Sequence, residues 1–260
     1  MLGRDKLQRL LEFAVDAARQ AGEITMEHFQ TILTPERKPD RTFVTTADRK
    51  AEERLRALIE AAYPDDGIVG EEFGEKRSAS GSTWIIDPLD GTASFIRGVP
   101  LFGVLIGLET KGEVVLGVAN FPALGDLVSA AKGMGCFWNG RRAAVSVVDD
   151  LKEALLLFTD GASFEPQGQE DAFRRLLAAT KMRRSWGDCY GHILVATGRA
   201  EVMLDPVMSV WDCAALLPIV QEAGGTFTDW AGRPTIRGGN AISTNGRLFD
   251  QVMRLLNEKG

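Results

Sequence analysis

Apolar side chains recur every three or four positions through the first part of the chain, which is the spacing of one face of an α-helix. One such pattern runs from Asp5 to about Phe29. A second begins after Val44, carries Asp48 in its first turn and ends at Tyr63. We predict two amphipathic helices, and the helix dipole alone is enough to favour an acid at Asp48.

Strand-like patterns follow these helices. Residues 68–72 predict a short strand in which Glu71 and Glu72 point to opposite faces, since adjacent side chains of a strand alternate. The dipeptides Lys111-Gly112 and Asn139-Gly140 are typical of hairpins. The first half therefore predicts a largely antiparallel sheet, with further strands at residues 84–86, 104–108, 114–121, 127–131, 136–138 and 143–147.

From residue 151 onward, strand-like and helix-like patterns alternate, which predicts an α/β layer packed on a sheet. The predicted strands are residues 154–159, 182–184, 201–204, 226–228 and 241–244. The predicted helices are residues 170–180, a helix after Gly187, residues 211–223 and a last helix through Leu256. No Pro/Gly/Ser-rich linker marks the change of polarity near residues 149–152, so we expect residues 1–150 and 151–260 to form one compact unit.

The composition is that of an ordinary globular protein. With 260 residues, 45% of them hydrophobic, the chain can bury a sizeable core. Its net charge of −6 argues against a general nucleic-acid surface, because such a surface needs clustered Lys and Arg. No apolar run is long enough for a membrane span and acids occupy the N-terminal segment, so we expect a cytoplasmic protein without membrane attachment. Without a Cys-x-x-Cys pair, Cys136, Cys189 and Cys213 are expected to be buried small hydrophobic residues.

Residues 84–95 concentrate the candidate chemistry. A β-branched and aromatic run should end as a buried strand at Asp87, and the proline and glycine that follow should turn the chain sharply. A helix that begins near Asp90 or Thr92 would direct free amide hydrogens into the space that the carboxylates share. Acids that bind a hard cation, beside amides that bind an anion, suit a metal-bridged phosphate. Taken alone, a solvated turn is the alternative.

Other catalytic signatures are absent from the sequence. It has no phosphate-binding P-loop, no Gly-x-Gly-x-x-Gly, no Gly-x-Ser-x-Gly and no His-Glu-x-x-His. Two histidines give little scope for imidazole chemistry. Carboxylates remain in quantity, and oxygen ligands on loops suit Mg²⁺ or, as a substitute, Mn²⁺.

Three separated motifs resemble the inositol monophosphatase family of metal-dependent phosphatases. They are Gly70-Glu71-Glu72, the run from Trp84 to Thr92, and Trp211-Asp212 with Ala214-Ala215 and Glu222-Ala223-Gly224-Gly225 behind it. They occur in the family's order, and the likeness spans nearly the whole chain. The resemblance implies a layered αβαβα sandwich of the inositol monophosphatase and fructose-1,6-bisphosphatase type. It also implies a homodimer that acts on a small phosphorylated substrate with two or three Mg²⁺ ions.

The resemblance assigns roles to individual residues. Asp48 and Thr92 would position the attacking water, and Glu71 would take part in catalysis as a metal ligand. The metal ligands would be Glu71, Asp87, the backbone carbonyl of Leu89, Asp90 and Asp212.

The chemistry of phosphate esters agrees with metal assistance. Phosphate-monoester hydrolysis needs up to ~10²¹-fold acceleration, whereas one positioned acid or base contributes about 10² to 10⁴. Two cations could bridge the phosphate, acidify a water and stabilise the leaving alkoxide. The amides of Gly91, Thr92 and Ala93 would hold the non-bridging oxygens. The cations would also neutralise four clustered carboxylates.

The leaving-group side departs from the inositol-cleaving pattern. The run from Gly187 to Gly191 is similar to the histidinol-phosphate phosphatases of this superfamily, whereas the inositol enzymes have a small residue at the position of Asp188. Asp188 and Asp205 would surround the leaving group with negative charge, which favours the cationic L-histidinol phosphate over a neutral polyol. A helix cap is the alternative role for Asp188.

Two neighbours of this acid pair have less definite roles. Arg184 is a candidate partner of Asp188 or of the phosphate, and the sequence does not decide between them. His192 is expected to be packed or hydrogen-bonded in a helix and not to act as a catalyst.

Three other functions stay open. An inositol or adenosine 3′,5′-bisphosphate phosphatase would use the same metals with a different leaving-group pocket. A haloacid-dehalogenase-like phosphatase would use Asp87 as a nucleophile, but the run from Asp87 to Thr92 has one residue too many for the Asp-x-Asp-x-Thr motif of that family. A non-catalytic metal-binding module would keep the fold without turnover.

Overall fold

The computed structural model describes residues 2–32, 34–39 and 42–258. The helices are α1 (Arg4–His28), α2 (Thr46–Ala62), α3 (Thr92–Phe95), α4 (Glu170–Ala179), α5 (Asp188–Ala196), α6 (Val210–Glu222) and α7 (Phe249–Asn257). The strands are β1 (Glu36–Arg37), β2 (Phe43–Val44), β3 (Gly67–Gly70), β4 (Gly74–Lys76), β5 (Ser82–Asp90), β6 (Gly103–Thr110), β7 (Glu113–Phe121), β8 (Asp126–Ala131), β9 (Gly135–Trp138), β10 (Arg141–Ala143), β11 (Leu155–Phe158), β12 (Met182–Arg184), β13 (Val202–Asp205), β14 (Thr226–Thr228) and β15 (Ala241–Thr244).

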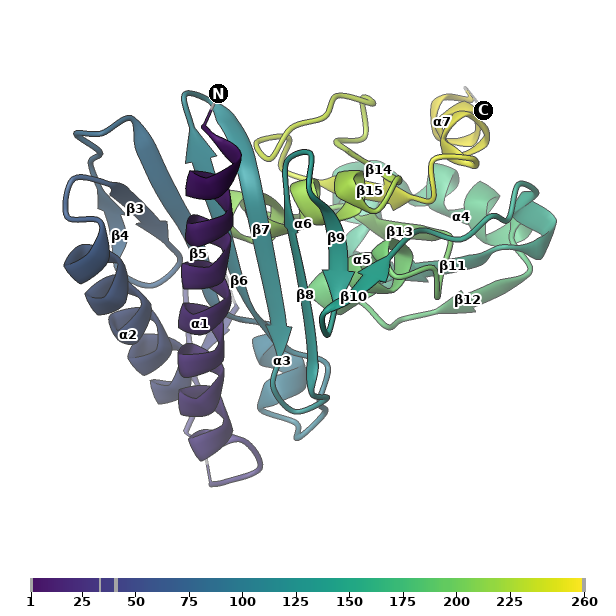
Figure 1. Ribbon diagram of the computed structural model, residues 1–260. Helices are drawn as coiled ribbons and strands as arrows, with labels where there is room; N and C mark the ends of the chain where they lie inside the picture. Colours follow the sequence, from purple (N-terminus) through teal and green to yellow (C-terminus); the bar gives the residue numbers. More distant parts are fainter. Residues whose placement is uncertain (1, 33, 40–41, 259–260) are drawn as a thin grey trace.

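These elements form alternating layers of helices and sheets (Figure 1). Helices α1 and α2 cover one face of an eight-stranded sheet, and α5 and α6 lie between that sheet and a five-stranded sheet. Helices α4 and α7 cover the far face of the second sheet. The αβαβα sandwich predicted from the sequence is confirmed.

The first helical layer follows from its apolar spacing. Leu7, Leu10 and Ala14 of α1 lie in one buried cluster with Leu55 and Ile59 of α2 and with the strands beneath them. Burial of such apolar faces, at about 25 cal/mol per Å², is what holds an amphipathic helix on a sheet. Both predicted helices are confirmed.

The eight-stranded sheet has the order β10-β9-β8-β7-β6-β5-β3-β4. Every neighbouring pair is antiparallel except β3 with β5, which run parallel. The predicted antiparallel sheet is therefore confirmed, with one parallel pair in it. The predicted strand over residues 143–147 is wrong beyond Ala143, because the amide of Val145 leaves the sheet and donates to the carbonyl of Ala223 at the end of α6 (3.1 Å).

Two more predicted strand ends are wrong, and both concern the candidate site. β3 ends at Gly70, so Glu71 and Glu72 lie in the turn that leads to β4 and do not alternate as strand residues. β5 does not stop at Asp87 but continues to Asp90 with a shift in its pairing to β6 between these two residues. Local propensity could not reveal either end, because strand ends depend on the pairing partner.

Helix α6 lies unusually close to the eight-stranded sheet. Gly107 of β6 pairs with Gly117 of β7, and both lie beneath α6. A Cβ atom on Gly117 would lie 2.1 Å from the carbonyl oxygen of Ala215, and one on Gly107 would lie 2.8 Å from the Cβ of Ala214. We call these four residues the α6 seam. Only glycine on the sheet side permits this approach.

The five-stranded sheet has the order β12-β11-β13-β15-β14. β11 is parallel to β12 and β13, while β15 is antiparallel to β13 and β14. Leu194 and Val195 of α5 pack on one face beside Met203, and Phe173 of α4 and Val252 of α7 pack on the other. The predicted α/β layer is confirmed, as a mixed sheet.

Two sequence expectations concern the rest of the described chain. All three cysteines are buried and free, as predicted. Among the helices within residues 2–32, 34–39 and 42–258, none is both long and apolar enough to cross a membrane.

Candidate functional site

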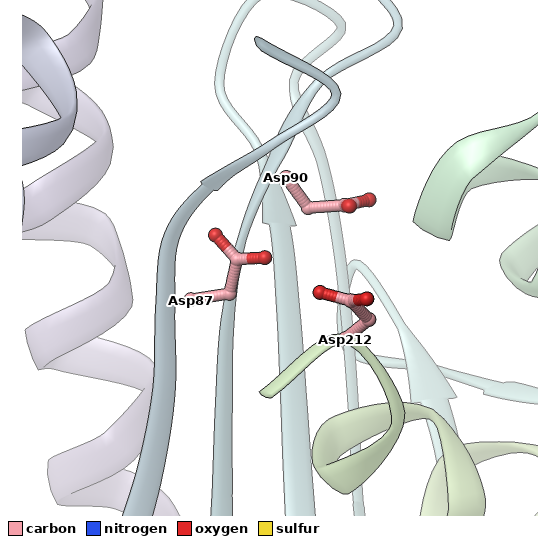
Figure 2. A group of neighbouring side chains, drawn as sticks. All are labelled: Asp87, Asp90 and Asp212. Atoms are coloured by element: carbon pink, nitrogen blue, oxygen red, sulfur yellow. The ribbon is translucent and has the colours of Figure 1, made fainter. Parts of the chain in front are cut away.

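Three carboxylates converge between β5 and the start of α6 (Figure 2). Asp87 and Asp90 extend from β5, and Asp212 extends from α6. Each offers an oxygen that lies within 4.8 Å of those of the other two. Residues far apart in the sequence therefore supply one compact oxygen-donor set.

The end of β5 places the two acids of this strand. Pro88 has no amide hydrogen for the ladder with β6, and the pairing shifts at this point. The Asp87 carboxylate accepts a hydrogen bond from the amide of Leu89 (2.9 Å). Gly91 then takes a left-handed conformation (φ 83°) and is the N-cap of α3, a single turn. Helix α3 thus begins at Thr92, as predicted, and its N-cap residue lies between Asp90 and Thr92.

The first turn of α6 places the third acid. Asp212 is the third residue of the helix, and its carboxylate accepts a hydrogen bond from the amide of Ser209, the N-cap residue (2.6 Å). Because the α6 seam holds the helix directly on β6 and β7, Asp212 is brought towards the neighbouring strand β5.

The electrostatics of the three acids indicate a cation site. Burial raises the pKa of Asp87, Asp90 and Asp212. Neighbouring negative charge raises the pKa of Asp87 and Asp212 further. Buried carboxylates are stable as anions only when paired or bound to a metal, and hard oxygen donors suit a divalent cation. The three acids could hold a metal ion.

Glu71 lies at the edge of this cluster and is paired with a lysine. The Lys38 ammonium donates to Glu71 (2.7 Å) and to Glu72 (2.6 Å). The prediction that these two glutamates point apart is therefore wrong, because they lie in a turn and not in a strand. Burial raises the pKa of Glu71 to about 7 against the lowering effect of Lys38. Burial alone would lower the pKa of Lys38, but the hydrogen bonds and negative charges of Glu71 and Glu72 have the larger combined effect and raise this pKa.

The turn that carries Glu71 is held by a buried acid of α2. The carboxylate of Glu52 accepts hydrogen bonds from the amides of Glu72 (2.7 Å) and Phe73 (3.1 Å) and from Nε of Arg56 (2.8 Å). A Cβ atom on Gly70 would lie 2.1 Å from Oε1 of Glu52, so this contact also requires glycine at the end of β3.

Asp48 and Thr92 form a second polar pair beside the acids. Asp48 is buried and is the third residue of α2, where it accepts hydrogen bonds from the amide (2.8 Å) and hydroxyl (2.6 Å) of Thr45. The Thr92 hydroxyl lies 3.1 Å from the other oxygen of Asp48 and 3.0 Å from the carbonyl of Leu89. Burial raises the pKa of Asp48.

The acids, the α3 turn and Asp188 line one cavity of about 470 Å³. The three predicted phosphate-binding residues, Gly91, Thr92 and Ala93, also line the cavity. Phe43, Val207 and Trp211 add apolar surface to the same cavity. It can therefore admit a small polar molecule with an organic part.

Asp188 faces this cavity from the start of α5. Its backbone has φ 50°, a left-handed conformation that is uncommon outside glycine and marks functional sites. A Cβ atom on Gly91 would lie 3.3 Å from Oδ2 of Asp188, so the carboxylate is close to the α3 turn. The N-cap of α5 is Gly187 and receives no side-chain bond, so the helix-cap alternative for Asp188 is wrong. Burial raises the pKa of Asp188, and the negative charges of Asp90 and Asp205 raise it further.

Neither Asp205 nor Arg184 is among the residues that line the cavity. Asp205, at the end of β13, is buried with Oδ2 3.3 Å from Nε2 of His192. His192 is buried as predicted, its Nδ1 lies 2.7 Å from the hydroxyl of Ser243, and burial lowers its pKa to about 3. Arg184 is exposed, bonds to the carbonyl of Arg183 (2.7 Å), and is not among the residues that line the cavity.

Sequence reasoning missed Lys38 and Glu52. Lys38 gave no signal, because it lies in a polar loop whose position only the fold defines. Glu52 did give one, since it follows Asp48 by four positions and so lies on the same side of α2 among alanine and leucine. A charged residue on the buried stripe of a helix indicates a partner.

Known proteins share this architecture. Residues 6–259 match the model of the inositol monophosphatase family. A protein of Chlorobaculum parvum named histidinol-phosphatase is 48% identical over 240 residues, which cover 92% of this chain and 93% of that protein. A Streptomyces coelicolor protein of the same name is 38% identical over 261 residues, with 96% and 97% covered.

A solved structure has the same fold as this chain. The extragenic suppressor protein suhB from Bartonella henselae matches with a TM-score of 0.91 at 30% identity, covering 97% of this chain and 100% of that one. Together with the family match, this excludes a haloacid-dehalogenase-like phosphatase. The chain belongs to the inositol monophosphatase family.

Proposed function

We propose that this protein is a Mg²⁺-dependent phosphomonoesterase that hydrolyses L-histidinol phosphate to L-histidinol and inorganic phosphate. The observation that carries the proposal is the position of the Asp188 carboxylate. It lies beside Gly91 and lines the same cavity as Asp87, Asp90 and Asp212. A phosphate at the three acids would therefore place its leaving group against a fourth acid.

The cation would be held by Asp87, Asp90 and Asp212, with Glu71 and the carbonyl of Leu89 as further donors. All five residues line the cavity. When bound there, Mg²⁺ would withdraw charge from the phosphate and acidify an attacking water. We propose two or three ions by the family resemblance, and Mn²⁺ as a substitute that the same oxygen donors accept.

Thr92 and Asp48 would orient the nucleophile. Since the Thr92 hydroxyl donates its hydrogen to Asp48 and to the Leu89 carbonyl, its oxygen is left as an acceptor for a water hydrogen. As that water attacks phosphorus, its proton can pass to the Thr92 oxygen while the Thr92 hydrogen passes to Asp48. The raised pKa of Asp48 suits this acceptor role. The amides of Thr92 and Ala93 would donate to the non-bridging oxygens, with Gly91 as the third expected donor.

Asp188 and Asp205 would select the leaving group. L-Histidinol phosphate carries an ammonium group and an imidazole that can be protonated, and a carboxylate pair stabilises both. A neutral inositol ring would leave the buried carboxylate of Asp188 in the cavity without a charged partner, which is costly. The relatives named histidinol-phosphatase support this substrate. Arg184 keeps only a secondary place in the proposal, as a residue that could reach the site by a side-chain movement.

A phosphate-release assay on the purified protein tests the proposal. L-Histidinol phosphate, inositol 1-phosphate and adenosine 3′,5′-bisphosphate are compared with Mg²⁺ and with EDTA. We expect kcat/KM for L-histidinol phosphate to exceed the others by at least about tenfold, as one charge-assisted pair would give. A preference for inositol 1-phosphate would show the substrate to be wrong. Absence of release from all three would show the catalytic role to be wrong.

Two expectations from the sequence stay predictions within this proposal. One is that the protein is a homodimer, and the other is that it acts in the cytoplasm.

A further inference from the structure

We infer that Thr159 is a positioning residue that holds Asp188 and Asp205 in the arrangement that selects a cationic leaving group. This inference rests on the proposed function, because it explains how the two acids of that function are oriented. Thr159 directly follows β11 and belongs to neither of the elements that carry the acids. No motif in the sequence distinguishes it.

Thr159 contacts both acids. Its hydroxyl oxygen accepts a hydrogen bond from the amide of Asp188 (2.8 Å). Its hydroxyl and its backbone amide face the carboxylate of Asp205 and oppose the rise in the pKa of that group that burial causes. A hydroxyl has one donor hydrogen and two acceptor lone pairs, so it can accept from Asp188 while its hydrogen faces Asp205. One side chain therefore links the start of α5 to the end of β13.

The contact with α5 is too close for any other residue at position 187. A Cβ atom on Gly187 would lie 2.2 Å from the Cα and 2.5 Å from the hydroxyl oxygen of Thr159. This approach brings the chain past Thr159 immediately before Asp188. The uncommon backbone conformation of Asp188 (φ 50°) persists only where its surroundings determine it. The bond from its amide to Thr159 is the contact that does so.

Asp205 is fixed from a second direction. Nε2 of His192 lies 3.3 Å from Oδ2 of Asp205, and Nδ1 of His192 lies 2.7 Å from the hydroxyl of Ser243. His192 is fully buried, so this support cannot be exchanged for water. Because His192 fixes Asp205, Thr159 lies beside an immobile carboxylate and can in turn hold the amide of Asp188 in place. Removal of the hydroxyl would leave Asp205 held by His192 but would release the backbone amide of Asp188.

The test compares three full-length variants with the unmutated protein. Thr159→Val keeps the size of the side chain and removes the hydroxyl, Thr159→Ser keeps the hydroxyl, and Asp188→Asn removes the charge that Thr159 is inferred to orient. Each is assayed for kcat and KM with L-histidinol phosphate and with p-nitrophenyl phosphate, whose leaving group carries no positive charge. Melting temperature and circular dichroism report whether each variant is folded.

We expect Thr159→Val to raise KM for L-histidinol phosphate by about tenfold or more, the scale of one hydrogen bond to a charged group. The kcat/KM for p-nitrophenyl phosphate should stay within about threefold, since the metal-binding acids are untouched. Thr159→Ser should restore KM, and Asp188→Asn should lower the preference for L-histidinol phosphate over p-nitrophenyl phosphate at least as much as Thr159→Val does. A merely structural role of Thr159 would lower activity on both substrates alike.

Four results would overturn the inference. The first is an unchanged preference between the two substrates in Thr159→Val, and the second is an equal loss on both substrates in that variant. The third is a failure of Thr159→Ser to restore KM. If Thr159→Val does not fold, Thr159→Ala takes its place with the same expectations. The fourth is Asp188→Asn with unaltered preference, and this result alone also removes the acid pair from the proposed function.

Discussion

At the residue scale, two acids of the candidate site lie in the first turn of a helix. Asp48 is the third residue of α2 and Asp212 is the third residue of α6, and each accepts a hydrogen bond from the backbone amide of the capping residue. The other oxygen of Asp48 faces the Thr92 hydroxyl (3.1 Å), while Asp212 lines the cavity itself. Helix capping, worth about 1 kcal/mol, keeps these acids oriented whether or not a cation is bound.

Asp90 has no such helix role, which makes it the clearest residue to test. Its Oδ2 accepts a hydrogen bond from the amide of Cys189 (2.6 Å), and the amide oxygen of asparagine could accept the same bond. We expect Asp90→Asn to lose about 100-fold or more in kcat/KM for L-histidinol phosphate, because metal assistance is worth several kcal/mol. The melting temperature should change little.

The matched control is Asp149→Asn, which makes the same chemical change at an exposed position. It should leave both turnover and melting temperature unaltered. Retained turnover in Asp90→Asn would remove Asp90 from the metal ligands. Isothermal titration with Mg²⁺ provides a second measurement, in which Asp90→Asn should bind more weakly than the control.

At the element scale, the α6 seam governs the position of Asp212. We expect Gly117→Ala to lower the free energy of unfolding by about 1 to 3 kcal/mol, the usual cost of overpacking, since its Cβ would lie 2.1 Å from the carbonyl oxygen of Ala215. A displaced α6 would also move Asp212, so turnover should fall even at temperatures where the variant is folded. Urea unfolding and the phosphate-release assay measure the two effects.

Gly161→Ala is the control for this change. A Cβ atom on Gly161 would be no closer than 3.6 Å to its nearest neighbour, which is an ordinary contact. This variant should lie within about 0.5 kcal/mol of the parent. If Gly117→Ala matches it in stability and turnover, the α6 seam does not set the position of Asp212.

The elements also show how far the sequence alone could lead. Helical spacing predicted α1 and α2, and hairpin dipeptides predicted the antiparallel strands, because both are local signals. The ends of β3, β5 and β10 were wrong, because pairing partners decide where a strand stops. The two-glutamate turn at Glu71 and Glu72 shows the consequence, since a misplaced strand end reversed the predicted direction of one side chain.

At the scale of the whole molecule, the acid cavity makes folding depend on pH. Burial raises the pKa of Asp87 and of Glu71, the latter to about 7. A carboxyl group whose pKa is higher in the folded state takes up protons on folding, so it destabilises the fold as pH rises from about 4 through that raised pKa. Without metal, we expect the free energy of unfolding to fall between pH 5 and pH 7.5 because of these groups.

Asp87→Asn isolates this contribution. In EDTA the variant should be more stable than the parent by about 1 kcal/mol or more at pH 7.5, with a smaller difference at pH 5. Mg²⁺ should raise the melting temperature of the parent more at pH 7.5 than at pH 5, and should have less effect on the variant. If the free energy of unfolding in EDTA varies with pH in the same way for the parent and for Asp87→Asn, this account is wrong.

Contacts between distant segments are what the sequence could not show. The acids of β5 and the acid of α6 were recognisable by their motifs. The partners of the residues that orient the site were not, although helical spacing indicates that Glu52 is buried. Lys38 is 33 residues from Glu71, Glu52 is 20 from Glu72 and Thr159 is 29 from Asp188, so no local pattern relates these pairs.

The α6 seam has one more consequence. Helix and sheet meet there through backbone atoms and a methyl group, with no rotatable side-chain bond between them. Larger side chains at a helix–sheet contact can change rotamer on the picosecond to nanosecond scale. The glycines and alanines of the α6 seam have no rotamers to exchange. The separation between the start of α6 and the sheet is therefore set by direct backbone contact, and the placement of Asp212 relative to Asp87 and Asp90 depends on it.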